Sequence, residues 1–582
     1  MKVKLINEQI TSDYGKNLLR ARGIEDVEKF LNPDESCLQT WEDLDNIKTG
    51  INEIAALSNE SKVGLIVDCD VDGFTSATIL YNYLHRYLPL LEFTFYIHEG
   101  KAHGLEEHWQ KISNENFDLV IVPDAGGNDK QYAEQINCPI LIIDHHLVED
   151  ENFSSNMIVI NNQLSKKYRN KNLSGAGMAY QFCRGMDYYF ENNWAKDYID
   201  LAALGICADM MSGLEIENQY FWKEGFANVK NTFFMALALK QAYSITGQTV
   251  SSWGEIQANL DPTTVAFYIV PLINAMVRMG TLEEKERMLH AFISGHDLVP
   301  SGKRGAKGTM EEVAIESVRE CTNARTHQNK FLDSATEILE QKIFKYDLLE
   351  NKILFIRLDE EDFPSELNGL VAMRLSQKYK HPTIVARLGE DGYIKGSLRG
   401  LNDSDLVSFK EYLNSTNLFE YVQGHDNAAG ISLLASNLSK LHNLANEELK
   451  NYDFNSNFYQ VDFQRQALSK DLPLIIEDLE KYKHVWSQKN NQPLLYITDL
   501  HFSKKNIKIM GKKEDTLKIE KNGIAFMKFF AKDMIEEIKR IPGDEIKLEI
   551  VGKANLNEWN GTVTPQIFIE NYEIKEDSLT DF

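Results

Sequence analysis

The chain lacks the features of a membrane protein or a disulfide-stabilised protein. No run approaches the roughly 18 apolar residues of a membrane span, and the N-terminus (MKVKLINEQITSDYGKN) lacks the apolar core of a signal peptide. The six cysteines are scattered and form no C-x-x-C pair, which argues against a disulfide framework and against a cysteine zinc site. We therefore expect a cytoplasmic protein that has no membrane as a partner.

Positive charge is also scarce. The 62 lysines and arginines stand against 87 aspartates and glutamates, which gives a formal net charge of -25. Such a balance disfavours long-range attraction to nucleic acid, but binding depends on local patches. A site built from carboxylates also adds negative charge that bound divalent cations would offset. Composition therefore leaves the partner open.

The pattern of apolar residues changes along the chain and predicts an α/β protein of four regions. Residues 1–240 combine N-terminal helices with a first α/β domain, and residues 241–350 form a helical region that ends in one long connecting helix over about 310–350. Residues 351–455 repeat an α/β pattern. Residues 456–582 alternate apolar with polar positions, which is typical of a small antiparallel barrel or sandwich.

Short, continuous apolar runs in the first region predict a parallel sheet. Runs of this length suit strands that are buried on both faces, and their spacing suits β-α-β crossovers. The expected strands are VGLIV (63–67), FTFYI (93–97), LVIV (119–122), PILII (139–143) and MIVI (157–160).

Three of these strands run into aspartates. The acids are Asp68, Asp70 and Asp72 after the first, Asp124 after the third and Asp144 after the fourth. Sites in open parallel sheets form at the carboxyl ends of strands, so these acids should gather, together with Asp209 after the run LAALGICA. A single aspartate after a strand is usually a helix cap or a turn residue, but the combination predicts a pair of divalent cations.

The ordered motifs resemble a known family. DCDVDGFTSA (68–77), VPDAGG (122–127), DHH (144–146) and LGICADM (204–210) are similar to the four motifs of the DHH phosphoesterases. Further segments resemble RecJ-type exonucleases in the same order and cover nearly the whole chain. They are RGIEDVEKFLNP (22–33), LSGAGMAYQF (173–182), INAMVRMG (273–280), KGSLRG (395–400), GHDNAAG (424–430) and WNGTVTPQIFIENYEI (559–574).

The resemblance implies a parallel-sheet DHH domain, a DHH-associated domain and a C-terminal barrel of the oligonucleotide-binding (OB) type. It also implies a centre for two divalent cations, Mn2+ or Mg2+, in which Asp144 and His146 orient ligands or contact substrate. The metal ligands would be Asp68, Asp70, Asp72, Asp124, His145 and Asp209, and the catalytic residues Asp70, Asp72, Asp124, His145, His146 and Asp209.

Two further sets of residues would bind substrate. Small residues and a guanidinium in the helical region and the second α/β domain would hold phosphate, although glycines there also suit plain turns and a lone arginine suits a solvated surface. The expected set is Asn274, Arg278, Gly396, Ser397, Arg399, Gly424 and His425. In the barrel, Lys504, Lys505 and Trp559 are candidates for contact with a single strand, with Phe502 beside the lysines. The alternative is a solvated lysine edge and a core tryptophan.

The implied activity is 5′-to-3′ hydrolysis of single-stranded DNA to mononucleotides by two-metal-ion catalysis, in DNA repair, recombination or replication. A single-strand-binding protein or a helicase would suit it as a partner. Gln423 replaces a glycine of the family pattern, and an arginine expected after Ile97 is missing, with His98, Lys101 or His103 in its place. In the family this arginine helps to hold a 5′-terminal phosphate, so its absence bears on the expected cleavage polarity. The alternatives are a DHH phosphodiesterase of short oligonucleotides or cyclic dinucleotides and an inactive single-strand-binding scaffold.

Overall fold

The chain folds into two compact units. The computed structural model describes residues 1–7, 10–100, 102–250, 252–306, 308–358, 363–401, 404–454, 458–511, 513–559 and 562–575. One unit comprises Glu28–Lys330 and His484–Asn491, and we call it the first unit. The other comprises Met1–Val27, Phe331–Lys483 and Gln492–Phe582. Residues 1–27 therefore belong with the C-terminal regions, whereas the sequence places them with the first domain.

The first unit contains the expected parallel sheet. Its five strands lie in the order β3-β2-β4-β5-β6, and every neighbouring pair is parallel. The chain therefore reverses its direction of travel across the sheet between β2 and β4. This is a topological switch point, where α/β sheets form their sites. The strands are β2 (Lys62–Val67), β3 (Glu92–Ile97), β4 (Leu119–Pro123), β5 (Ile140–Asp144) and β6 (Met157–Asn161).

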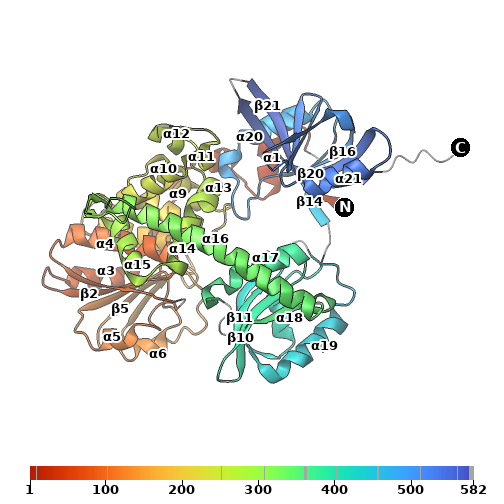
Figure 1. Ribbon diagram of the computed structural model, residues 1–582. Helices are drawn as coiled ribbons and strands as arrows, with labels where there is room; N and C mark the ends of the chain where they lie inside the picture. The colour runs from red at the N-terminus through yellow and green to blue at the C-terminus, as the bar shows by residue number, and fades with distance from the viewer. Residues whose placement is uncertain are drawn as a thin grey trace. The chain divides into compact units, whose positions relative to one another are not determined.

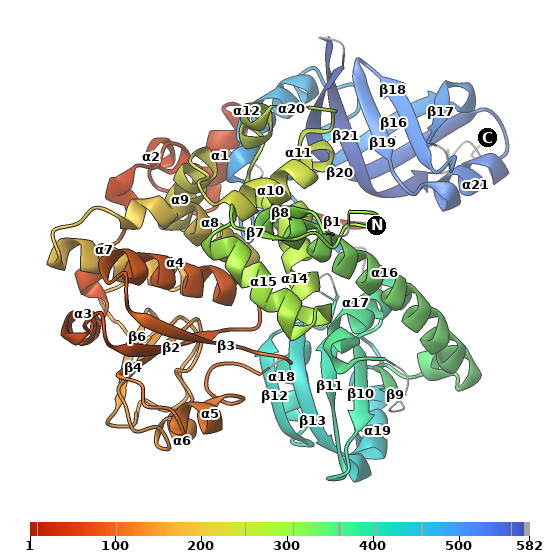
Figure 2. The same cartoon turned by 60° about the vertical axis from the view of Figure 1, so that its left-hand side comes forward.

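Helices cover both faces of this sheet (Figure 2). In β2, Val63, Leu65 and Val67 belong to one core, to which α4 (Val71–Tyr87) and α7 (Gly175–Tyr189) contribute. Ile66 points into a second core with α5 (Trp109–Ser113) and α6 (Lys130–Ala133). Because both faces of the strand are buried, the residues that point to either face are apolar, which explains the continuous hydrophobic run.

The remaining helices of this unit follow the sheet or precede it. The segment Pro262–Met279 has the length and mean hydropathy (1.2) of a membrane span, but half of it is buried in the protein interior. The helices are α2 (Val27–Leu31), α3 (Ile47–Ala56), α8 (Ile199–Ala208), α9 (Ile216–Ala227), α10 (Thr232–Lys240), α11 (Ala242–Thr246), α12 (Trp253–Gln257), α13 (Pro262–Thr264), α14 (Val270–Met279) and α15 (Leu282–Ile293).

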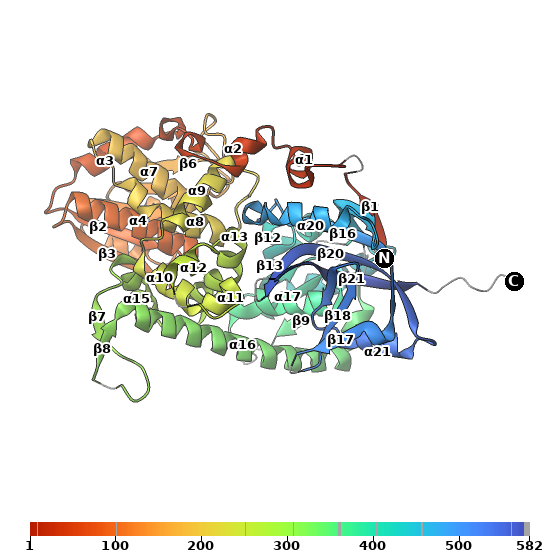
Figure 3. The same ribbon diagram turned by 90° about the horizontal axis from the view of Figure 1, so that it is seen from above.

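A long helix connects the two units. After the short hairpin β7 (Leu298–Pro300) and β8 (Met310–Glu312), α16 runs without interruption over Val313–Lys345. Its 33 residues correspond to about 50 Å at 1.5 Å per residue, and Figure 3 shows its full length. The helix expected over about 310–350 is confirmed.

The second unit contains a mixed sheet (Figure 1) of five strands in the order β12-β13-β11-β10-β9, which Figure 2 labels. Only β9 and β10 are parallel. Helix α17 (Asn368–Tyr379) packs against β10 and β11, and α18 (Phe409–Ser415) and α19 (Leu438–Glu448) contribute to the core of the sheet. The strands are β9 (Leu354–Leu358), β10 (Thr383–Leu388), β11 (Tyr393–Arg399), β12 (Phe419–His425) and β13 (Ala428–Leu434).

The C-terminal region forms a seven-stranded, largely antiparallel sheet in the order β15-β16-β20-β21-β19-β18-β17. Next to it, β1 (Lys2–Leu5) pairs in parallel with β14 (Phe458–Val461). That pairing, with α1 (Tyr14–Ala21), ties the N-terminus to this unit. The other elements are β15 (Phe463–Gln466), α20 (Leu472–Glu480), β16 (Leu494–Ser503), β17 (Ile507–Met510), β18 (Thr516–Lys521), β19 (Ile524–Lys528), α21 (Lys532–Arg540), β20 (Glu545–Trp559) and β21 (Thr562–Lys575).

Candidate active site

The first motif joins β2 to α4 and fixes three acids. Asp68 follows the strand directly, Asp70 caps the helix by accepting a hydrogen bond from the Gly73 N–H at 2.9 Å, and Asp72 lies in the first helical turn. Asp72 is fully buried and accepts hydrogen bonds from Ser174 Oγ (2.8 Å) and from the N–H groups at the start of α7. The helix N-terminus thus holds this carboxylate in one position.

Asp124 and His145 meet at the carboxyl ends of β4 and β5. Asp124 has a left-handed backbone (φ 66°), and its Oδ1 lies 3.1 Å from His145 Nε2. Both atoms are buried, and neither has a hydrogen-bond partner among the described residues. His145 Nε2 also lies 3.6 Å from Asp209 Oδ2 and 3.9 Å from Asp72 Oδ2. The imidazole is therefore surrounded by three carboxylates.

The donor atoms form two neighbouring groups that could hold cations, and Asp124 of one lies 3.1 Å from His145 of the other. In one group Asp68, Asp70 and Asp124 bring their oxygens within 4.8 Å of one another, and in the other Asp72, His145 and Asp209 do so. Carboxylate oxygens with one imidazole suit Mn2+ or Mg2+. The buried, unpartnered atoms of Asp124 and His145 fit such ions as well, because buried polar atoms rarely remain without a partner.

Electrostatics supports the same interpretation. Burial, followed by the charges of Asp72 and Asp70, holds the pKa values of Asp124 and Asp209 well above their usual range. Burial lowers the pKa of His145 to about 4, so the imidazole is neutral at pH 7 and its ring nitrogen can act as a ligand. Without cations these carboxylates destabilise one another, and bound cations would remove that repulsion.

Asp144 and His146 form a supporting pair beside this group. The Asp144 carboxylate accepts the backbone N–H groups of Gly127 (3.1 Å) and His145 (2.7 Å), and it lies 2.9 Å from His146 Nδ1. Burial alone would raise the pKa of Asp144, but the interactions with His146 bring it well below its usual value. For His146, burial acts downward and the hydrogen bond to Asp144 raises the pKa to about 9. An orienting role for this pair stays a prediction.

Two glycines whose role the sequence did not reveal allow the acids to pack. A Cβ on Gly175 would lie 2.6 Å from Asp124 Cβ, and a Cβ on Gly205 in α8 would lie 2.5 Å from Ala176 Cβ while overlapping Asp72 Oδ1. Both glycines stand in segments quoted for the family resemblance, LSGAGMAYQF and LGICADM. Because these two glycines have no side chain, the carboxylates of Asp124 and Asp72 can pack against them.

A second layer of polar residues surrounds Asp68. His103 Nδ1 lies 2.6 Å from Asp68 Oδ2, and the Gly104 N–H donates to Asp68 Oδ1 at 3.1 Å. The hydrogen bond to Asp68 raises the pKa of His103 to about 11. Of the residues named in place of the missing arginine, His103 is thus paired with an acid of the site, and Lys101 lies outside the described residues.

Of the expected phosphate-binding residues, two lie in the first unit. Asn274 and Arg278 stand one turn apart on α14, and both are half-buried. Burial lowers the pKa of Arg278, and the charge of Asp70 acts in the opposite direction. Arg278 therefore lies within electrostatic reach of the acid cluster.

The other five lie on neighbouring strands of the second unit. Ser397 on β11 pairs with Gly430 on β13, which pairs with Gln423 on β12, so the KGSLRG and GHDNAAG segments adjoin. A Cβ on Gly396 would lie 2.5 Å from Ala386 Cα, so this glycine has a packing reason of its own. The five residues are Gly396, Ser397, Arg399, Gly424 and His425. The Arg399 guanidinium lies against Gly369, Gly424 has a φ of 131°, and His425 is exposed.

The candidates of the C-terminal sheet divide in their surroundings. Lys504 Nζ donates to the Ile541 carbonyl at 2.5 Å, which indicates a structural role, whereas the Lys505 side chain is 85% exposed. Phe502 is buried, so the prediction of a stacking ring beside the lysines is wrong for this residue. Trp559 ends β20, and its side chain lies outside the described part of the chain.

Comparisons with known proteins identify the family. The model of the DHH family N-terminal domain matches residues 62–206, and that of the RecJ OB domain matches residues 468–571. The putative SPbeta prophage-derived single-strand DNA-specific exonuclease YorK of Bacillus subtilis (strain 168) is 35% identical over 588 residues, covering 99% of this chain and 98% of the relative. This chain belongs to the RecJ-type DHH exonuclease family. The single-stranded-DNA-specific exonuclease RecJ of the same organism is 24% identical and covers 100% of this chain and 70% of its own length.

The family fold extends over the chain. RecJ from Thermus thermophilus in complex with Mn2+ matches with a TM-score of 0.71 at 18% identity, covering 99% of this chain and 79% of that structure. The same protein in complex with Mg2+ matches with a TM-score of 0.66. The expected architecture, with its DHH domain and its C-terminal OB domain, is therefore confirmed.

Proposed function

We propose that this protein hydrolyses single-stranded DNA from its 5′ end to mononucleotides in a reaction that depends on divalent metal ions. The observation that carries the proposal is the largely buried group of Asp70, Asp72, Asp124, His145 and Asp209 at the switch point of the sheet, in which Asp124 and His145 have unpartnered donor atoms. Family membership supports the substrate, because the relatives are named as single-strand-specific exonucleases.

The cations would supply the reactive chemistry, and the protein's residues would hold and orient them. Two divalent cations, when bound, would supply a nucleophile from water at neutral pH and offset the charge that gathers on the phosphate. Asp68, Asp70, Asp72, Asp124, His145 and Asp209 would hold them. The hydrogen bonds from Ser174 and the start of α7 fix Asp72 before substrate arrives, so its carboxylate need not reorganise during the reaction. His146, whose hydrogen bond to Asp144 raises its pKa to about 9 against the effect of burial, would place a positive charge beside the group.

Substrate would be bound by residues outside the acid group. Arg278 and Asn274 would contact phosphate from α14, and Ser397, Arg399 and His425, with the backbone at Gly396 and Gly424, would do so on the second unit. Lys505 is the best-exposed lysine among the OB-domain candidates. We place the reaction in the cytoplasm, in DNA repair, recombination or replication, with a single-strand-binding protein or a helicase as the kind of partner that exposes strands.

A time course on single-stranded DNA labelled at either end tests the proposal. With Mn2+ or Mg2+, the 5′ label should appear at once as mononucleotide, and both a chelator and Asp124→Ala should abolish its release. Early release of the 3′ label instead would refute the polarity. If long strands survive while dinucleotides or cyclic dinucleotides are cut, the substrate is a short or cyclic dinucleotide. If strands are bound but nothing is cleaved, the protein is a scaffold.

A further inference from the structure

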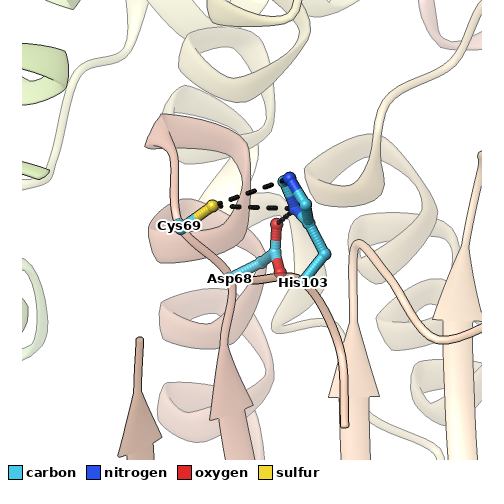
Figure 4. Close-up of side chains that lie close together, drawn as sticks. All are labelled: Asp68, Cys69 and His103. Carbon is cyan, nitrogen blue, oxygen red and sulfur yellow. Dashed lines mark hydrogen bonds and ion pairs between the residues drawn. The ribbon is translucent and has the colours of Figure 1, made fainter. Parts of the chain in front are cut away.

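A thiol, an imidazole and a carboxylate meet on the outer side of the acid group. Cys69 Sγ lies 3.6 Å from His103 Nδ1 and 3.8 Å from His103 Nε2, and His103 Nδ1 lies 2.6 Å from Asp68 Oδ2. Figure 4 shows the three side chains converging at the end of β2. Their donor atoms all lie within 4.8 Å of one another. Mn2+ and Mg2+ prefer oxygen ligands to thiolate sulfur, whereas Zn2+ binds thiolate sulfur, imidazole nitrogen and carboxylate oxygen.

The spacing of these atoms suits a tetrahedral ion. With Zn–S near 2.3 Å and Zn–N near 2.0 Å, a tetrahedral angle places sulfur and nitrogen about 3.5 Å apart, close to the 3.6 and 3.8 Å observed. The nitrogen and oxygen, now 2.6 Å apart, would have to separate to about 3.3 Å. The His103 side chain is 60% exposed and lies on the loop after β3, so its ring has room for that shift.

A buried histidine faces the same carboxylate from the protein interior. The side chain of His98 is fully buried, and its Nε2 has no hydrogen-bond partner among the described residues. This nitrogen lies 3.7 Å from Asp68 Oδ1, while Nδ1 lies 3.1 Å from Glu107 Oε2. A carboxylate that holds one ring nitrogen and leaves the other free is the arrangement that orients histidines toward metals. The unpartnered Nε2 therefore lies beside Asp68, whose carboxylate also contacts His103.

We propose that Asp68, Cys69 and His103 form a further metal site, selective for a thiophilic divalent cation such as Zn2+, and that filling it inhibits the neighbouring centre. Asp68 also belongs to the donor group with Asp70 and Asp124. An ion bound by Asp68, Cys69 and His103 would therefore compete with the neighbouring centre for the Asp68 carboxylate. It would also add positive charge beside the two catalytic cations. The inhibition rests on the proposed nuclease function, but the binding does not.

Cobalt reports the binding directly. Co2+ titrated into the full-length, Mn2+-loaded protein should give a near-ultraviolet thiolate-to-cobalt charge-transfer band that saturates at one equivalent. Cys69→Ser should lose this band, and Zn2+ should displace the cobalt that causes it. Cys138→Ser is the matched control, since Cys138 is the other partly exposed cysteine, and it should keep the band. Absence of the band in the wild-type protein, or its survival in Cys69→Ser, would overturn the site.

Zinc inhibition tests the regulatory part. In the Mn2+-supported nuclease assay, the wild-type protein should be inhibited at a Zn2+ concentration at least about tenfold lower than Cys69→Ser, while the two proteins match without zinc. Equal sensitivity would mean that zinc acts by entering the manganese centre, which refutes regulation through Cys69. If no nuclease activity is found at all, the proposed function fails, and the cobalt band still decides whether the site exists.

Discussion

Replacement of Gly205 by alanine should damage the metal centre through a single methyl group. The added Cβ would overlap Asp72 Oδ1 and lie 2.5 Å from Ala176 Cβ and 2.7 Å from Thr75 Oγ1, about 1 Å closer than a normal non-bonded contact of roughly 3.5 Å. Alanine gains up to about 1 kcal/mol in helix propensity, but overpacking a full core costs about 1–3 kcal/mol. We therefore expect net destabilisation, with the Asp72 carboxylate displaced by on the order of 1 Å.

Such a displacement has a measurable consequence. A shift of about 1 Å in a positioned group can lower the rate about 100-fold, and loss of ligand support lowers metal affinity about 10–100-fold. Steady-state cleavage of single-stranded DNA, measured over a range of Mn2+ concentrations, separates the two effects. Gly254→Ala in α12 is the control, because Gly254 is exposed and its Cβ would meet nothing within 4 Å. Wild-type rate and Mn2+ affinity in Gly205→Ala would refute the placement of Asp72 as a ligand.

Three further predictions concern single side chains. The folded-state pKa of His146 is raised to about 9, so its pairing with Asp144 should stabilise the fold fully below the unfolded pKa near 6.5 and lose this effect as pH rises through about 9. Thermal melts in chelator should show that the loss of thermal stability caused by His146→Gln becomes smaller over that range. A loss of stability that grows with pH would contradict the pairing. Lys504→Ala should lower thermal stability, because its ammonium is bonded to the Ile541 carbonyl. Lys505→Ala should leave stability unchanged and reduce the salt dependence of strand binding by about 0.7 in log–log slope; an unchanged slope would exclude contact with a phosphate.

The sequence predicted most of the sheet and the acids around it, for a physical reason. Strands buried on both faces must be apolar throughout, so VGLIV and MIVI mark β2 (Lys62–Val67) and β6 (Met157–Asn161) to within one residue. A parallel sheet then brings the ends of its strands to one edge. The gathering of Asp70, Asp72 and Asp124 follows from that rule and from where each stands in the chain.

Other features depend on contacts between distant segments and could not be predicted. The four residues of β1 carry no strong pattern, and only their pairing with β14, more than 450 residues away, makes them a strand. Gly205 is a plain helical glycine until Asp72 is packed against it. The pairing of His103 with Asp68 depends on the path of the loop after β3. In each case a neighbour in space, absent from the local sequence, gives the residue its role.

The number of Mn2+ ions bound per chain tests the central claim most directly. Titration of metal-free protein, followed by the electron paramagnetic resonance signal of unbound Mn2+, should give two ions per chain for the wild-type protein. Asp124→Ala should lose tight binding, because the Asp124 carboxylate stands beside both donor groups. Two tightly bound ions in Asp124→Ala, or none in the wild-type protein, would contradict the assignment of this acid cluster as the metal centre.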